Sequence, residues 1–103
     1  MHEVDIVRAH REETRWRILR CLDAGRPVAV GETVIYRALH DAALDLTPAT
    51  LRRELDYLRD KGLVQLHHED APVWAAELTH LGVDVVEYTV DAPPGIGRPK
   101  KWA

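Results

Sequence analysis

The stretch "LTPATLRRELDYLRDKGLVQL", residues 46–66, contains the start, the apolar stripe and the end of one helix. Thr47 before Pro48 is the pairing expected of an N-cap followed by the first helical position. Gly62 supplies the left-handed residue that often ends a helix. Three leucines recur at helical spacing and share one face: Leu51, Leu55 and Leu58. The spacing predicts a helix at about 48–61 with this face toward a core.

Two further helices are predicted before this one. Residues 4–25 lack Pro and internal Gly, and Gly25 is expected to cap their end. Their second half has a row at helical spacing: Arg15, Ile18, Leu19 and Leu22. Residues 32–45 form a helix with one apolar side: Val34, Ile35, Ala38, Leu39, Ala42 and Ala43. "RPVAV", 26–30, is a connector or a short strand.

A hairpin and a last helix are predicted after residue 62. "LVQLHHE", 63–69, and "VWAAEL", 73–78, are extended runs separated by the turn-forming "DAP". Thr79 caps a final helix in 79–90, with apolar residues at helical spacing: Leu81, Val85 and Tyr88. The predicted fold is mainly α with a small β-hairpin, in the order helix, strand, helix, helix, strand, strand, helix. Residues 1–90 form the domain and 91–103 a Pro/Gly-rich basic tail.

Residues 46–66 together with "AELTHLGVDVV", 76–86, resemble the winged helix-turn-helix DNA-binding regulators of bacteria and phages. The resemblance covers about residues 10–88, and the size and basic ending are similar to small regulatory proteins of Mu-like prophages. It implies that helix 48–61 enters the major groove of double-stranded DNA and that the hairpin is a wing beside it. It also implies a homodimer with two recognition helices about one DNA turn apart.

The outward face of helix 48–61 carries the candidate DNA contacts. If the leucines point inward, the opposite face has Ala49, Arg52, Arg53, Asp56, Tyr57 and Asp60, with Thr50 at its margin. Arg53 suits guanine, which accepts a bidentate contact. Four residues suit phosphates: Thr47, Thr50, Arg52 and Tyr57. Alternatively the face is a solvated surface with Arg52–Asp56 and Asp56–Arg59 ion pairs.

The hairpin lacks the Arg and Lys of a DNA-contacting wing, because residues 63–97 carry six acids and no cation. Its turn offers two histidines and two acids: His67, His68, Glu69 and Asp70. An alternative function is therefore a non-catalytic protein-interaction module that uses an acidic wing. A metal site with His80 is a further alternative, but the spacing matches no zinc pattern.

Composition limits the class of protein. The chain has 103 residues, 46% hydrophobic and 30% charged, with net charge −3, which suits one soluble domain. Neither a membrane span of roughly 18 apolar residues nor a signal peptide is present, so we expect a cytoplasmic protein. Without serine or a glycine-rich phosphate loop, no enzyme and no cofactor is expected. Cys21, Trp16 and Trp74 are expected in the core or an interface.

The ending "PPGIGRPKKWA", 93–103, brings three cations together: Arg98, Lys100 and Lys101. "GRPKK" resembles the core of an AT-hook, which lies in the minor groove of A·T-rich DNA. Ile96 stands where a hook would have another Arg. The alternatives are a solvated tail, or one whose Trp102 folds back onto the domain or a second subunit.

Overall fold

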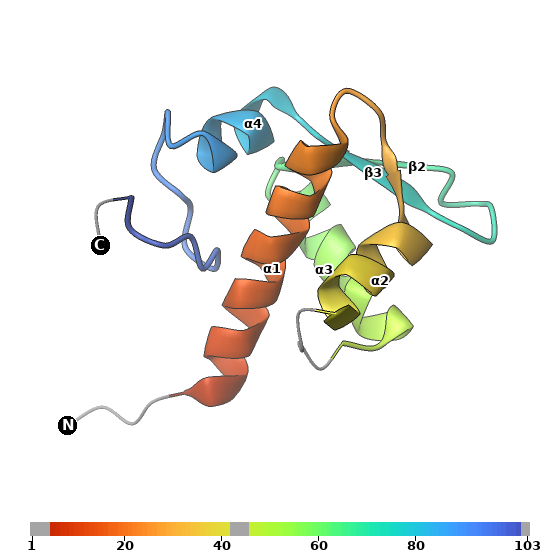
Figure 1. Cartoon of the computed structure of the whole chain (residues 1–103), viewed down its shortest axis with the longest axis horizontal. Helices are drawn as coiled ribbons and strands as arrows, with labels where there is room; N and C mark the ends of the chain where they lie inside the picture. The colour runs from red at the N-terminus through yellow and green to blue at the C-terminus, as the bar shows by residue number, and fades with distance from the viewer. Residues whose placement is uncertain (1–4, 42–45, 102–103) are drawn as a thin grey trace.

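The chain follows the predicted order of elements (Figure 1). The computed structural model describes residues 5–41 and 46–101. The elements are α1 (Ile6–Gly25), β1 (Val30–Gly31), α2 (Glu32–Asp41), α3 (Pro48–Asp60), β2 (Val64–His67), β3 (Ala75–Leu78) and α4 (His80–Val86). The predicted extension of α2 through Ala42 and Ala43 lies outside the described residues. Within the described ranges, no helix has the length and apolarity needed to cross a membrane.

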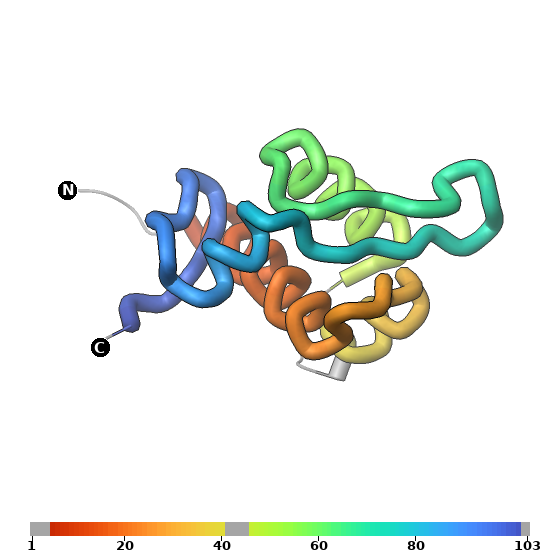
Figure 2. The backbone as a smooth tube through the Cα atoms, turned by 90° about the horizontal axis from the view of Figure 1, so that it is seen from above, coloured from red at the N-terminus to blue at the C-terminus, as the bar shows by residue number. Residues whose placement is uncertain are grey.

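The three strands form one antiparallel sheet in the order β1-β3-β2. The two extended runs pair as the predicted hairpin, with Val64 opposite Leu78 and His67 opposite Ala75. Val30 of β1 pairs with Ala76, so "RPVAV" is a connector whose last residue begins a two-residue strand. The β2–β3 hairpin projects from the helices, as Figure 2 shows from above.

The core lies where α1, α2 and α3 meet beneath the sheet. The leucine face of α3 is at most 1% exposed, and Ile18, Leu19 and Leu22 of α1 pack with it. Trp16 is also buried, with its ring edge-on to Tyr88. Three residues predicted on apolar faces are instead exposed: Val34 at 58%, Leu81 at 45%, and Ala38. All three belong to short helices, in which other positions such as Ile35, Leu39 and Val85 are buried.

Two glycines allow close packing between elements. The prediction that Gly25 caps the end of α1 is wrong, because Gly25 is the last residue of the helix, without positive φ, and Arg26 is the C-cap. A Cβ at Gly25 would instead lie 2.4 Å from a methyl group of Val30. A Cβ at Gly82 would lie 2.1 Å from the carbonyl oxygen of Leu63, so α4 packs directly on the entry to β2.

The segment after α4 packs back along α1, where the sequence predicted a separate tail from residue 91 (Figures 1 and 2). The backbone N–H of Gly97 donates to the carbonyl of Glu12 at 2.9 Å. Ile96 is 9% exposed and belongs to the core. The apolar side chain of Ile96 therefore anchors a Pro/Gly-rich stretch that has no helix or strand of its own.

Candidate nucleic-acid interface

The local sequence fixes both ends of α3, as predicted. The Thr47 hydroxyl accepts a hydrogen bond from the backbone N–H of Thr50 at 3.1 Å, and Pro48 begins the helix. Gly62, with φ of 76°, follows the last turn. Because the leucines point inward, the exposed positions of the helix form an outer face: Pro48, Ala49, Arg53, Arg59 and Asp60.

Arg53 and Thr50 are the predicted contacts on α3 with donors still available. Arg53 is exposed and makes no hydrogen bond or ion pair within residues 5–41 and 46–101. The Thr47 hydroxyl donates to Thr50 Oγ1 at 2.8 Å, so the hydroxyl hydrogen of Thr50 itself remains available. Thr47 uses its own hydroxyl hydrogen in this cap.

Arg52 is held inside the domain by the start of α2 and the wing turn. Its Nε donates to Glu32 Oε2 at 2.8 Å and its Nη2 to the carbonyl of Pro72 at 2.9 Å. Its guanidinium carbon lies 4.4 Å from the ring centroid of Trp74, and the backbone N–H of Trp74 donates to Glu32 Oε1. The expected Arg52–Asp56 pair is therefore wrong, because the buried Glu32 is the partner; Asp56 pairs with Arg59 at 3.1 Å, as expected.

This contact changes the acidity of Glu32, which is 7% exposed. The hydrogen bond from Arg52 lowers the pKa of the Glu32 carboxyl, helped by the backbone N–H of Trp74 and opposed by burial. Glu32 therefore stays ionised and fixes α2, α3 and the wing relative to one another.

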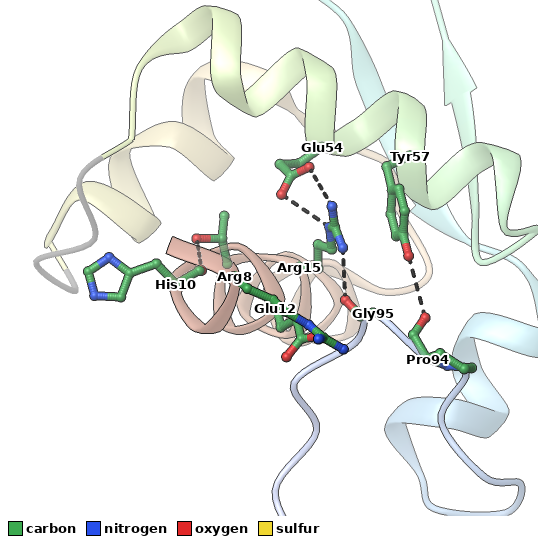
Figure 3. A network of polar contacts seen from close by, with 9 residues as sticks. Arg8, His10, Glu12, Arg15, Glu54, Tyr57, Pro94 and Gly95 are labelled. Carbon is green, nitrogen blue, oxygen red and sulfur yellow. Dashed lines mark hydrogen bonds and ion pairs between the residues drawn. The ribbon is translucent and has the colours of Figure 1, made fainter. Parts of the chain in front are cut away.

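A second buried ion pair joins α1 to α3 (Figure 3). Arg15 Nε and Nη2 donate to the two Glu54 oxygens at 3.1 and 3.4 Å, and Nη1 donates to the Gly95 carbonyl at 3.1 Å. The guanidinium also lies 3.5 Å from the ring centroid of Tyr57, whose hydroxyl donates to the carbonyl of Pro94. Tyr57 thus faces α1 and the C-terminal segment instead of the outer face of α3.

Sequence reasoning missed the roles of Arg15 and Glu54. Arg15 is buried beside Trp16 on α1, and Glu54 is buried between Leu51 and Leu55 on α3. The available sequence signal for this ion pair was a base within the apolar face of one helix and an acid within the apolar face of another.

The C-terminal cations have different surroundings. Arg98 Nη1 donates to the carbonyls of Val85 and Val90 at 2.9 and 2.8 Å, and its guanidinium lies over the Tyr88 ring. Lys100 and Lys101 are exposed. Trp102 lies outside the described residues. Internal carbonyls therefore hold the Arg that an AT-hook would place in the minor groove.

The wing turn is stabilised by its own acids. Glu69 Oε1 accepts from Arg59 at 2.6 Å, and the Glu69 carbonyl accepts from the Trp74 indole at 3.1 Å. His67 Nε2 contacts Glu77 Oε1 at 2.9 Å, and His68 has φ of 62°. Within the described residues no three His, Cys, Asp or Glu side chains are grouped to hold a metal.

Two hollows flank α3. One, the α1–α3 groove, measures about 610 Å³ and lies between the amino-terminal half of α1 and the first turns of α3, with Arg11, Thr50 and Arg53 in its walls. The other, about 700 Å³, lies between α2, the start of α3 and the wing turn, with Tyr36, Ala49 and Val73 in its walls. Candidate contacts on α3 thus border a hollow on each side.

The fold is similar to the solved structure of RosR from H. salinarum, grown from NaBr. The TM-score is 0.63 and the sequence identity 26%, over 80% of each chain. RosR is a winged-helix-type transcription regulator, and the four helices and small antiparallel sheet described here have the winged-helix architecture. No family model and no curated protein matches the chain.

Proposed function

We propose that this chain is a transcriptional regulator that binds a specific sequence of double-stranded DNA, with α3 in the major groove. The observation that carries the proposal is the exposed Arg53, which has no partner among residues 5–41 and 46–101 and stands on the outer face of a helix whose leucines are buried in the core. The similarity to RosR supports a regulator of the DNA-binding kind. No catalytic function and no cofactor is part of the proposal.

Arg53 is proposed to read a guanine, whose O6 and N7 match the guanidinium fork. Ala49 is placed to contact a thymine methyl, and Thr50 to donate to a phosphate. Thr47, Arg52, Tyr57 and Arg98 have partners inside the domain, so we assign them to holding the interface in shape. Lys100 and Lys101 are proposed as phosphate contacts from the end of the C-terminal segment.

We also propose that two copies bind DNA together, because paired recognition helices one DNA turn apart read a symmetric site. The proposed location of the protein is the cytoplasm. Light scattering of the free protein and of its DNA complex measures the number of copies. A selected site without half-site symmetry, bound by one copy, contradicts the dimer. The similarity to RosR does not bear on membership of the Mu-like prophage regulators, which stays a prediction.

Selection of binding sites from random duplex DNA tests the function directly. The selected duplex is then titrated by fluorescence anisotropy at several salt concentrations, and log affinity should fall linearly with log salt. Arg53→Ala should cost about 1 to 3 kcal/mol on this duplex and relax preference at one base pair. The proposal fails if no sequence is enriched and no duplex binds at low salt.

A protein partner for the wing is the second candidate function. The observation in its favour is the absence of Lys and Arg from residues 63–97, together with the exposed Asp70 at the tip. Stoichiometric capture of one protein, unchanged by Arg53→Ala and lost on Asp70→Lys, would favour this function over DNA binding.

A further inference from the structure

The α1–α3 groove continues along α1 and α3 toward the C-terminal segment. A smaller hollow of about 320 Å³ shares Arg11, Arg15 and Tyr57 with it and adds Arg8 and Lys61 to the lining. One continuous surface therefore runs from the start of α3, past the amino-terminal half of α1, to the end of α3.

This surface has an excess of positive charge. Its lining contains two carboxylates, and each already has an arginine partner: Glu12 pairs with Arg8 at 3.3 Å and Glu54 with Arg15 at 3.1 Å. Its other cations have no acid partner among residues 5–41 and 46–101: Arg11, Arg53 and Lys61. An anion entering the groove would meet these cations without displacing an ion pair.

The wing, on another side of α3, has the opposite charge. Its acids are Glu69, Asp70 and Glu77, with no Lys or Arg between residues 63 and 97. Arg59, at the end of α3, is occupied by Glu69. The cationic protein surface beside a duplex bound to α3 therefore lies along α1.

We propose that the α1–α3 groove binds the phosphate backbone beside the major groove that receives α3, with Arg11 as its main phosphate contact and Thr50 as a neutral donor. The inference rests on the proposed function. Arg53 connects the two surfaces, because it lines the groove and also stands on the outer face of α3. Arginine suits this position since its planar fork can donate to two phosphate oxygens.

The test compares Arg11→Gln with Arg17→Gln. Both remove one charge from an exposed position of α1, but Arg17 lies outside the groove and pairs with Glu13 at 3.3 Å. Neither change is expected to unfold the protein, which circular dichroism checks. On the selected duplex, Arg11→Gln should make the negative slope of log affinity against log salt less steep by about 0.9. The ratio of the variant's affinity to the wild-type affinity should therefore change about 3-fold between 50 and 200 mM salt. Its base preference should stay as in wild type.

Neutral methylphosphonates, placed one at a time in the duplex, identify the phosphate. One such substitution should weaken wild type and Arg17→Gln but leave Arg11→Gln unchanged. Equal salt slopes for the two variants, in a protein that binds its duplex, overturn the inference and leave the proposed function standing. A change of oligomeric state in Arg11→Gln alone also overturns it, because the groove would then contact a second copy. Failure of wild type to bind any duplex refutes the proposed function itself.

Discussion

Replacing Glu54 by Gln removes the counter-charge of a buried guanidinium. The side chains of Arg15 and Glu54 are 10% and 6% exposed. In the variant Arg15 keeps its hydrogen bond to Gly95 and its place over the Tyr57 ring, but its charge is no longer balanced. Removing one member of a buried ion pair costs about 3 to 5 kcal/mol. Because the Gln carbonyl still accepts one hydrogen bond, we expect about 3 kcal/mol, a large share of the roughly 5 to 15 kcal/mol of a typical domain.

Urea unfolding followed by far-ultraviolet circular dichroism measures this loss. In thermal unfolding, Tm should fall by about 12 to 24 °C, from about 4 to 8 °C per kcal/mol for a domain of this size. Glu13→Gln is the matched control, because Glu13 and Arg17 form an ion pair in which each side chain is 48% exposed. The control should change the free energy of unfolding by less than about 0.5 kcal/mol.

The double variant Arg15→Met, Glu54→Leu separates charge imbalance from lost packing. Removing both charges leaves neither one uncompensated, so the double variant should be more stable than Glu54→Gln. The reasoning is refuted if Glu54→Gln lies within about 1 kcal/mol of wild type. It is also refuted if the loss of unfolding free energy in the double variant equals the sum of the losses in Arg15→Met and in Glu54→Leu, since that means the two side chains are not coupled.

Glu32→Gln should cost about 1 to 2 kcal/mol at neutral pH, reduced by the partial exposure of Arg52. Since the folded state lowers the pKa of Glu32, its contribution is complete above about pH 4.5 and is lost as the pH falls, so wild type and variant should converge in acid urea titrations. Gly82→Ala should cost more than about 2 kcal/mol, because its Cβ would lie 2.1 Å from the Leu63 carbonyl oxygen, which cannot move without shifting β2. Wild-type stability in this variant would show that the helix tolerates displacement.

Local signals predicted α3 and the hairpin well. The Thr47–Pro48 start, the leucine spacing and Gly62 all act within one helix, and the structure confirms each. The two runs of the hairpin pair because they are separated by a short turn-rich segment. These features depend on residues near in sequence, where propensity and spacing are informative.

Partners distant in sequence could not be predicted in this way. Arg52 was expected to pair along its own helix, but its partner lies 20 residues away at the start of α2. Arg15 and Gly95 are 80 residues apart, and the acceptor is a backbone carbonyl, which leaves no sequence signal. The prolines and glycines of residues 93–98 predicted a tail by composition, whereas in the structure Ile96 is buried and Gly97 bonds to α1. Placement of Tyr57 toward α1 follows from that docking.

The contact between Glu12 and Gly97 sets an order of events during synthesis. A ribosome makes α1 first, yet Gly95, which accepts a hydrogen bond from Arg15, is made 80 positions later. Until residue 98 has left the ribosome, Trp16, Arg15 and Tyr57 lack part of their packing. The nascent chain therefore exposes part of these groups until the segment that covers them has been made.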